Sequence, residues 1–275
     1  MFLGIHKLYR CAMDRWDTFW FSPTPSANYT LFRVCQGVTL MLYLAAWWRH
    51  APEWIGTDGF HFPDEVFPPL PSGILPIFGI IQFGALLLFT LGWQTRLFAI
   101  VSWLCFCYVT LVDRIAAFSI NSIFIFTLAI FAVYPGSGRI GGQLAATPVR
   151  LLQIALVAIY FSSGWHKAVY GNWLDSPTTL QNIMSGMFMT DIAARSLQTF
   201  PAGVWTAAQY VTLAFELFSP VLFFSRKLKW IGIAFGCVFH IGIALFMHQL
   251  IYFSLQMMSF YVLFLPADRQ RKHFP

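Results

Sequence analysis

Charged residues are scarce in this sequence. Asp, Glu, Lys and Arg together make up 10% of the 275 residues, whereas an average soluble domain carries roughly 25%. Hydrophobic residues make up 58% and aromatic residues 19%. A soluble domain of this length does not have enough interior to bury so much apolar surface. The composition therefore excludes an ordinary soluble domain and predicts a polytopic membrane protein.

Several motifs of soluble enzymes are absent as well. The sequence has no P-loop, no dinucleotide-binding glycine fingerprint and no nucleophile elbow. The basic residues are dispersed between apolar segments, so the net charge of +6 does not predict nucleic-acid binding. The N-terminal stretch of residues 1–27 has no apolar h-region, so we do not expect a signal peptide.

Cysteines are few, and four of the five lie inside apolar runs. Such a placement does not build a secreted disulfide framework. Cys105 and Cys107 form a C-x-C pair, but on a helix the two side chains would point about 200° apart. We therefore interpret the cysteines as small core residues rather than as metal ligands or redox groups.

Long apolar segments dominate the chain, and a membrane-spanning helix needs about 20 mostly apolar residues. Eight segments are candidates: 28–48, 74–93, 97–112, 120–135, 150–167, 204–224, 229–247 and 250–266. Connections rich in Pro and Gly separate them, as at 67–73 and 135–138. The predicted fold class is all-α, a polytopic transmembrane helical bundle of about eight spans, with residues 1–275 forming one domain.

The basic residues predict the orientation of these spans. With eight spans both termini lie on one side, and that side collects twelve of the 17 basic residues: Lys7, Arg10, Arg15, Arg96, Arg139, Arg150, Arg226, Lys227, Lys229, Arg269, Arg271 and Lys272. The other side has Arg49, Arg114, Lys167 and Arg195, together with seven acids: Glu53, Asp58, Asp64, Glu65, Asp113, Asp175 and Asp191. Since cytoplasmic loops are enriched in Lys and Arg, we expect both termini, and the segment 1–27, to be cytoplasmic.

One of the two long outer loops, 168–203, has an amphipathic pattern. Apolar residues recur in it at spacings of three and four: Leu180, Ile183, Met184, Met187, Phe188 and Ile192. This spacing predicts a helix on the membrane surface. The helix could cap the bundle or help to dock a substrate, and the sequence leaves both possibilities open.

Glu216 and His240 lie well inside predicted spans, where ionisable residues are costly and usually face the protein interior. Glu216 shares one side of the sixth span with Gln209, Thr212 and Ser219. His240 in the seventh span has glycines on its face, at a spacing that marks close helix packing. An ion pair of Glu216 with Arg33 or with His240 is possible, and it could serve either structure or chemistry.

Lys167 ends the fifth span within Gly164-Trp165-His166-Lys167. It falls on the same side of that helix as Tyr160 and Ser163. We predict that Lys167 turns inward, since an anchoring lysine would extend from a lipid-facing position. A poorly solvated amine is held neutral more easily, and a neutral amine can act as a base. Simple anchoring at the membrane surface is the alternative.

These features together resemble the HTTM family, the membrane domain shared with vitamin K-dependent gamma-carboxylase. The resemblance runs through most of the chain, and small stand-alone bacterial members are similar in size. Its residues are Arg33, Gly56, Gly59, Ser119-Ile120-Asn121-Ser122, Gly164-Trp165-His166-Lys167, Trp173-Leu174-Asp175, Glu216 and Phe239-His240.

The resemblance implies an enzyme at the extracytoplasmic face of a bacterial cytoplasmic membrane. In the carboxylase, the lysine that matches Lys167 deprotonates reduced vitamin K, which then reacts with oxygen. It therefore implies a reduced quinone and oxygen as cofactors, membrane lipid as a partner, and a secreted peptide or a separate extracytoplasmic protein as a further partner. The expected catalytic residues are Lys167, His240, Asn121 and Glu216, and the expected cofactor-binding residues are Tyr160, Trp173, Gln209 and Arg33.

Two other functions stay open at this point. The chain could be a non-catalytic partner in peptide maturation, immunity or assembly, with its polar groups only holding helices together. It could also be a metal-dependent membrane oxidase, since His50, His61, His166 and His248 fall on the predicted outer side, as does Asp64. No histidine spacing supports the metal site, so we predict no metal ligands.

Overall fold

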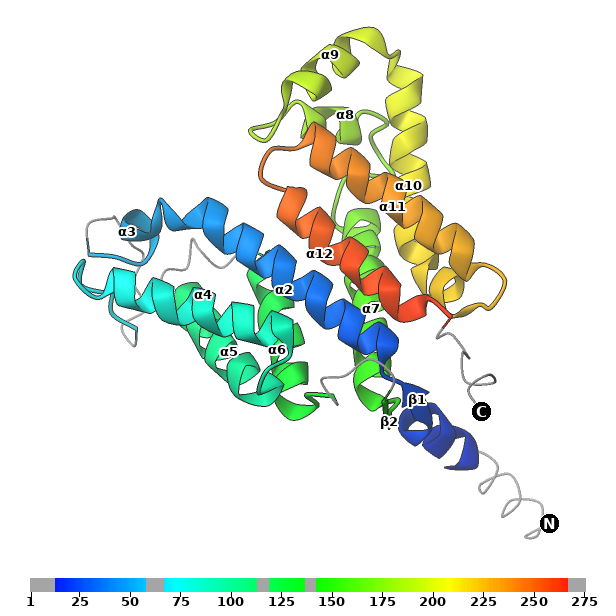
Figure 1. Cartoon of the computed structure of the whole chain (residues 1–275). Coiled ribbons are helices and arrows are strands. Elements are labelled where there is room, and N and C mark those ends of the chain that lie inside the picture. The colour runs from blue at the N-terminus through cyan, green and yellow to red at the C-terminus, as the bar shows by residue number, and fades with distance from the viewer. Residues whose placement is uncertain (1–12, 58–66, 113–118, 137–141, 267–275) are drawn as a thin grey trace, which may run out of the picture. The chain divides into compact units, whose positions relative to one another are not determined.

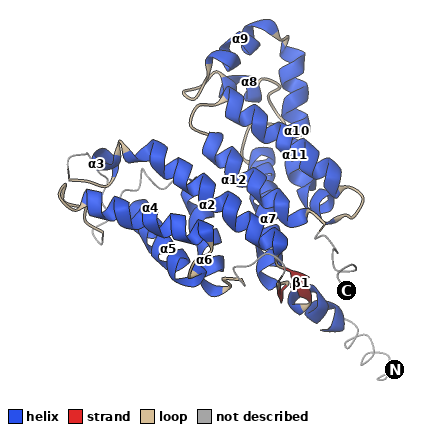
Figure 2. Ribbon diagram, in the orientation of Figure 1, coloured by secondary structure: helices blue, strands red, loops and turns tan. Residues whose placement is uncertain are grey.

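The computed structural model describes residues 13–57, 67–112, 119–136 and 142–266. Apart from turns and loops, these residues form helices and one two-stranded antiparallel sheet of β1 (Pro23–Pro25) and β2 (Gln143–Ala145) (Figure 2). The prediction of an all-α chain is thus confirmed. Some residues of the sequence analysis lie outside the described part: Lys7, Arg10, Asp58, Gly59, His61, Asp64, Glu65, Asp113, Arg114, Arg139, Arg269, Arg271 and Lys272.

The chain divides into two compact units, which are Met1–Leu151 with Pro266–Pro275, and Leu152–Leu265. In the first unit, β1 is followed by helices α2 (Ala27–Trp48), α3 (Ala51–Trp54), α4 (Leu75–Leu91), α5 (Thr95–Val112) and α6 (Ser119–Val133) (Figure 1). Helix α4 packs on both α2 and α5, and α5 packs on α6. Glycines allow the close approach, since a Cβ at Gly37 of α2 would overlap the Thr90 side chain of α4.

The second unit contains most of α7 (Thr147–Val169) and all of the later elements. These are α8 (Thr179–Met184), α9 (Asp191–Thr199), α10 (Ala202–Phe224), α11 (Lys229–Phe246), α12 (Ile251–Tyr261) and the 3-10 helix η2 (Val262–Phe264). Helix α11 packs on α10 and α12, while the short helices α8 and α9 pack on α10 and α11 respectively. Helix α10 runs without interruption through Pro220.

Each of the eight predicted segments contains a helix. Within the described residues, five helices are long and apolar enough to cross a membrane: α2, α5, α7, α10 and α11. Three shorter apolar helices, Leu75–Leu91, Ser119–Val133 and Ile251–Phe264, fall below that length. Many large apolar side chains of these helices are exposed, including Ile80, Leu91 and Val238. Five long apolar helices with such surfaces indicate an integral membrane protein.

The segment 168–203, which was predicted to lie on the outer side, differs from the prediction of one amphipathic helix. It contains two short helices, α8 and α9, separated by Ser185–Thr190. The break is held to the end of α11, because the Thr190 hydroxyl donates to the Leu245 carbonyl at 2.8 Å and the His248 amide donates to the Phe188 carbonyl at 2.7 Å. Contacts with α11 therefore override the local helical spacing.

Candidate functional site

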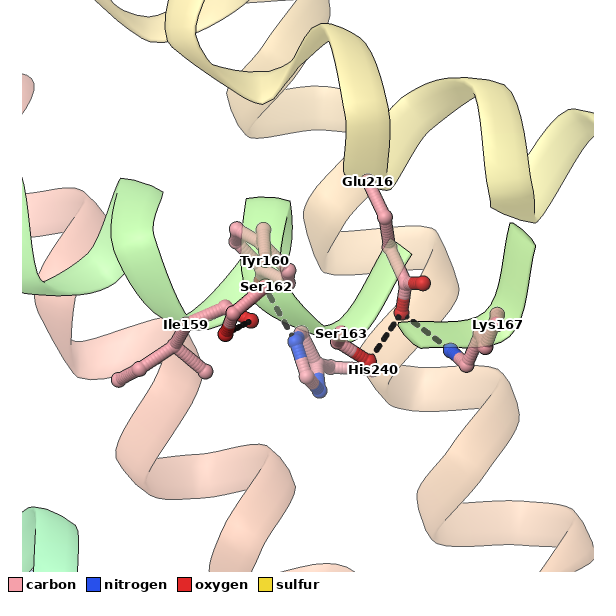
Figure 3. Close-up of polar contacts among 7 residues, drawn as sticks. All are labelled: Ile159, Tyr160, Ser162, Ser163, Lys167, Glu216 and His240. Carbon is pink, nitrogen blue, oxygen red and sulfur yellow. Dashed lines mark hydrogen bonds and ion pairs between the residues drawn. The ribbon is translucent and has the colours of Figure 1, made fainter. Parts of the chain in front are cut away.

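Lys167 of α7 and Glu216 of α10 form a partly buried ion pair (Figure 3). The Lys167 Nζ lies 2.5 Å from the Glu216 Oε1, and the Ser163 hydroxyl donates to the same oxygen at 3.3 Å. The Glu216 side chain is only 4% exposed and that of Lys167 25% exposed. The second carboxylate oxygen, Oε2, is buried and has no hydrogen-bond partner among the described residues. The pair therefore presents one acceptor atom that the described protein leaves unused.

Gly164 allows α7 and α10 to approach closely enough for this pair to form. A Cβ at position 164 would lie 2.9 Å from the Glu216 Cβ and 3.0 Å from the Leu217 backbone nitrogen. The first distance is shorter than real Cβ contacts and the second is tighter than most of them, so α7 and α10 pack in close contact at this point. The Ser219 hydroxyl also donates to the Val157 carbonyl at 3.4 Å, one helical turn farther along α10. Gly164, which belongs to the predicted Gly164-Trp165-His166-Lys167 motif, thus has a packing role.

Trp173 covers the lysine at the end of α7. The Lys167 Nζ lies 4.8 Å from the centre of the indole ring, within the range of a cation–π contact. Trp173 itself is buried in a cluster with Leu180, Met184, Trp205 and Leu213. The prediction that Lys167 turns inward is confirmed, since its amine meets a carboxylate and an aromatic ring.

Gln209 of α10 holds the segment that carries Trp173. Its Nε2 donates to the carbonyls of Trp173 and Ser176 at 2.7 and 2.8 Å, and its Oε1 accepts from the Leu180 amide at 2.9 Å. The Gln209 side chain is fully buried. Gln209 therefore fixes the backbone around Trp173, and its predicted role in binding a cofactor stays a prediction.

Replacing Gln209 by leucine should loosen this segment. The Leu180 amide and two carbonyls would lose their partners, which we expect to lower the free energy of unfolding by roughly 2 kcal/mol. Hydrogen exchange of the Leu180 amide should become about tenfold faster. The exposed Gln198 offers a matched control, and Gln198→Leu should leave both quantities unchanged. An unchanged Leu180 exchange rate in Gln209→Leu would contradict the role of this clamp.

A second polar cluster joins α7, α11 and α12. The Tyr160 hydroxyl lies 2.6 Å from the His240 Nε2 and also hydrogen-bonds the Tyr261 hydroxyl. Figure 3 shows the His240 ring pointing from α11 toward Tyr160. His240 is fully buried, and its Nδ1 has no partner among the described residues. The prediction that His240 faces protein is confirmed, and a hydrogen-bonded chain of two tyrosines and a histidine results.

Gly236 makes room for these hydrogen-bonded side chains. It lies one turn before His240 on α11, and a Cβ there would overlap the Tyr261 ring, 2.6 Å from its Cζ. Phe223 stacks on Tyr261, and Phe239 and Phe253 meet the His240 ring edge to face. The hydroxyls and the imidazole therefore bond to one another inside an aromatic environment that offers few other polar partners.

Arg33 and Asn121 belong to the first unit, where each has its own contacts. The Arg33 guanidinium is 3% exposed, lies against Gly92 and donates to the Thr95 hydroxyl at 3.5 Å. Gly92 ends α4 with a left-handed φ of 82°, so a buried cation meets the negative end of that helix. Asn121 accepts a hydrogen bond from the Tyr43 hydroxyl at 3.0 Å. The predicted roles of Arg33 and Asn121 in chemistry stay predictions.

The expected partners of Glu216 were wrong. The sequence analysis considered Arg33 or His240, but the ion pair is made with Lys167, and His240 bonds to Tyr160. The sequence shows that Glu216 needs a partner, whereas the identity of that partner depends on which faces of α7 and α10 meet. Tyr261 was missed altogether, because one hydroxyl in an apolar helix carries no signal of its partner. The nearest sequence signal was Gly236, a small residue on the face that Tyr261 meets.

The histidines of the proposed metal site have other surroundings. His50 pairs with Glu53 at 3.3 Å, and the His166 ring packs on Tyr170. His61 and Asp64 lie outside the described residues. Within the described part of the chain, no three His, Cys, Asp or Glu side chains gather closely enough to hold a metal ion. No observation therefore favours the metal-dependent oxidase.

In comparisons with known proteins, no family model, no curated protein and no solved structure matches this chain. The class of this protein therefore follows from its fold and the geometry of its site alone. The protein is a helical integral membrane protein with a partly buried lysine–glutamate pair at the end of one candidate span, next to a buried hydrogen-bonded tyrosine–histidine cluster.

Proposed function

We propose that the chain is an eight-span membrane enzyme of the HTTM type, with both termini cytoplasmic and residues 168–203 on the outer side. The three shorter apolar helices then cross the membrane together with the five long ones. The distribution of basic residues supports this topology, since twelve of 17 lie on the proposed cytoplasmic side. The enzyme would act at the extracytoplasmic face of a bacterial cytoplasmic membrane.

The observation that carries the proposal is the Lys167–Glu216 pair. An ion pair can change to its neutral form by moving one proton along a short hydrogen bond, with no change in net charge. Desolvation of the Glu216 carboxylate, whose side chain is 4% exposed, opposes the charged pair, because burying an ion costs several kcal/mol. In the neutral form Lys167 is an amine and can accept a proton from a substrate. Glu216 then decides how much of the lysine is available as a base.

The site has groups that fit a reduced quinone. The Glu216 Oε2 and the His240 Nδ1 are buried polar atoms without partners among the described residues, and they could bond to the oxygens of such a ring. A bound quinol would supply two electrons and two protons to oxygen, which would leave the quinone and hydrogen peroxide. Lys167 would take the hydroxyl proton, Tyr160 would orient His240, and Trp173 would limit access of water to the amine.

Activity of Lys167 variants tests this proposal. We expect the purified protein in lipid nanodiscs to accelerate oxygen consumption when supplied with a reduced short-chain naphthoquinol. Lys167→Ala should lower that rate by a factor of about 10² or more, since general bases contribute about 10² to 10⁴. The exposed Lys227, which lies between α10 and α11, gives a control variant, Lys227→Ala. Full activity in both Lys167→Ala and Lys167→Arg would refute the proposed chemistry.

A non-catalytic partner protein is the second candidate. The observation in its favour is that both polar clusters tie helices together: Lys167 joins α7 to α10, and Tyr160 joins α7 to α11 and α12. This candidate gains if the naphthoquinol has no effect on the wild type and if Lys167 variants change only stability.

A further inference from the structure

A hollow of about 470 Å³ lies directly after α7, next to the proposed site but separate from its chemistry. The side chains that shape it are Asn172, Trp173, Ser176, Thr179, Asn182 and Ile183. The hollow is shallow and largely open to the surface rather than an enclosed cavity. Trp173 lies between the hollow and the amine of Lys167, since it lines the hollow and its ring contacts the amine.

The lining is polar but uncharged. Among the described residues that form it, the polar side chains are two amides and two hydroxyls, with no acid or base. From 168 to 194 the sequence contains no Lys, Arg or His, and the charged side chains there are Asp175 and Asp191. Lys167, the nearest cation in sequence, is neutralised by Glu216. Phosphates and carboxylates would therefore find no counter-charge in the lining, and its amides and hydroxyls suit an uncharged ligand.

The walls of the hollow are firmly held. Gln209 binds the carbonyls of Trp173 and Ser176 and the Leu180 amide, and the Thr179 hydroxyl donates to the Asn172 carbonyl at 2.8 Å. The side-chain amides of Asn172 and Asn182 are exposed and make no hydrogen bond to the described residues. Each amide offers a donor and an acceptor side by side, which matches a pair of neighbouring hydroxyls.

Position selects the source of such a ligand. The hollow begins two residues beyond the end of α7, a candidate span, so it lies at the level of lipid headgroups. Apolar side chains border it, since Ile183 lines the hollow and the nearby Tyr170 and Leu174 are largely exposed. A polar, uncharged pocket with an apolar border at this depth suits a headgroup attached to acyl chains.

We infer that this hollow binds an uncharged polyhydroxyl group, the sugar headgroup of a membrane glycolipid. The inference does not depend on the proposed enzyme activity. The side-chain amides of Asn172 and Asn182 hold the sugar hydroxyls, and Ile183 meets the apolar part of the lipid.

Calorimetric titration of the full chain in a sugar-free detergent tests the inference. The probes are a dioctanoyl glucosyl diacylglycerol, dioctanoyl phosphatidylglycerol, dioctanoyl phosphatidylcholine and methyl β-glucoside. We expect saturable binding of the glucosyl lipid, weaker binding of methyl β-glucoside and no binding of the two phospholipids. Asn172→Ala and Asn182→Ala should each lower the affinity for the glucosyl lipid about fivefold, which is the effect of one lost hydrogen bond.

The variants are chosen so that folding does not confuse the result. Both asparagines are exposed, and Gln198→Ala on α9 changes an exposed amide away from the hollow. Gln198→Ala should bind the glucosyl lipid like the wild type. If methyl β-glucoside binds as tightly as the glucosyl lipid, the hollow is a sugar site, but its ligand is a soluble sugar and not a glycolipid. Phosphatidylglycerol binding as tightly as the glucosyl lipid, or unchanged affinity in both asparagine variants, would overturn the inference. Naphthoquinol oxidation is measured separately, so either result can fail alone.

Discussion

Replacing Lys167 by methionine should lower the free energy of unfolding by roughly 3–5 kcal/mol, because the Glu216 carboxylate would stay buried without its cation. The reverse change, Glu216→Leu, should cost less, about 1–2 kcal/mol. The lysine side chain is 25% exposed and can turn its amine toward water, whereas the glutamate is 4% exposed and cannot. Unfolding in mixed detergent and SDS micelles, followed by circular dichroism, measures both values.

The double variant Lys167→Met with Glu216→Leu separates stability from chemistry. Replacing a whole buried pair by apolar residues is often neutral, so we expect its stability within about 1 kcal/mol of the wild type. Its naphthoquinol activity should nevertheless be lost.

Glu53→Gln breaks an exposed pair with His50 and should change stability by at most about 0.5 kcal/mol. Equal costs for the two single variants would contradict the asymmetric burial.

Gly236→Ala and Gly242→Ala should have effects of opposite sign, although both glycines lie on α11. A Cβ at Gly236 would overlap Tyr261, and we expect a loss of roughly 2–4 kcal/mol from overpacking and a broken hydroxyl contact. A Cβ at Gly242 would meet nothing within 4 Å. Alanine there should stabilise the helix by up to about 1 kcal/mol.

The same unfolding measurement distinguishes these outcomes. Adding Tyr261→Phe to the Gly236→Ala variant gives a check, because the hydroxyl contact is already lost there and the second change should cost little. If Gly236→Ala matches Gly242→Ala in stability, then α11 and α12 do not pack as closely as the Tyr160–Tyr261 contact requires.

The sequence predicted the helices well, because each depends on neighbouring residues. The apolar run 204–224, for example, appears as α10 with bounds Ala202–Phe224, and 229–247 appears as α11 with bounds Lys229–Phe246. Length and hydrophobicity are local properties, and a bilayer span needs both. The loop 168–203 was less predictable, since contacts of Thr190 with the end of α11 break its helical pattern.

The site was partly predictable for a related reason. A charged or polar residue in an apolar helix already indicates an inward position, and Lys167, Glu216 and His240 were found in this way. The identity of each partner was not available from the same argument. Lys167 and Glu216 are 49 positions apart, and Tyr160 and Tyr261 are 101 apart.

Composition and local pattern alone therefore determined that this chain is helical, apolar enough for a membrane, and equipped with a few costly polar residues. Only the tertiary structure decided that Glu216 meets Lys167, that Gly164 lets their helices touch, and that Gln209 supports Trp173. The reason is physical: a helix forms from hydrogen bonds four residues apart, whereas a buried charge is stabilised by whichever distant segment packs against it.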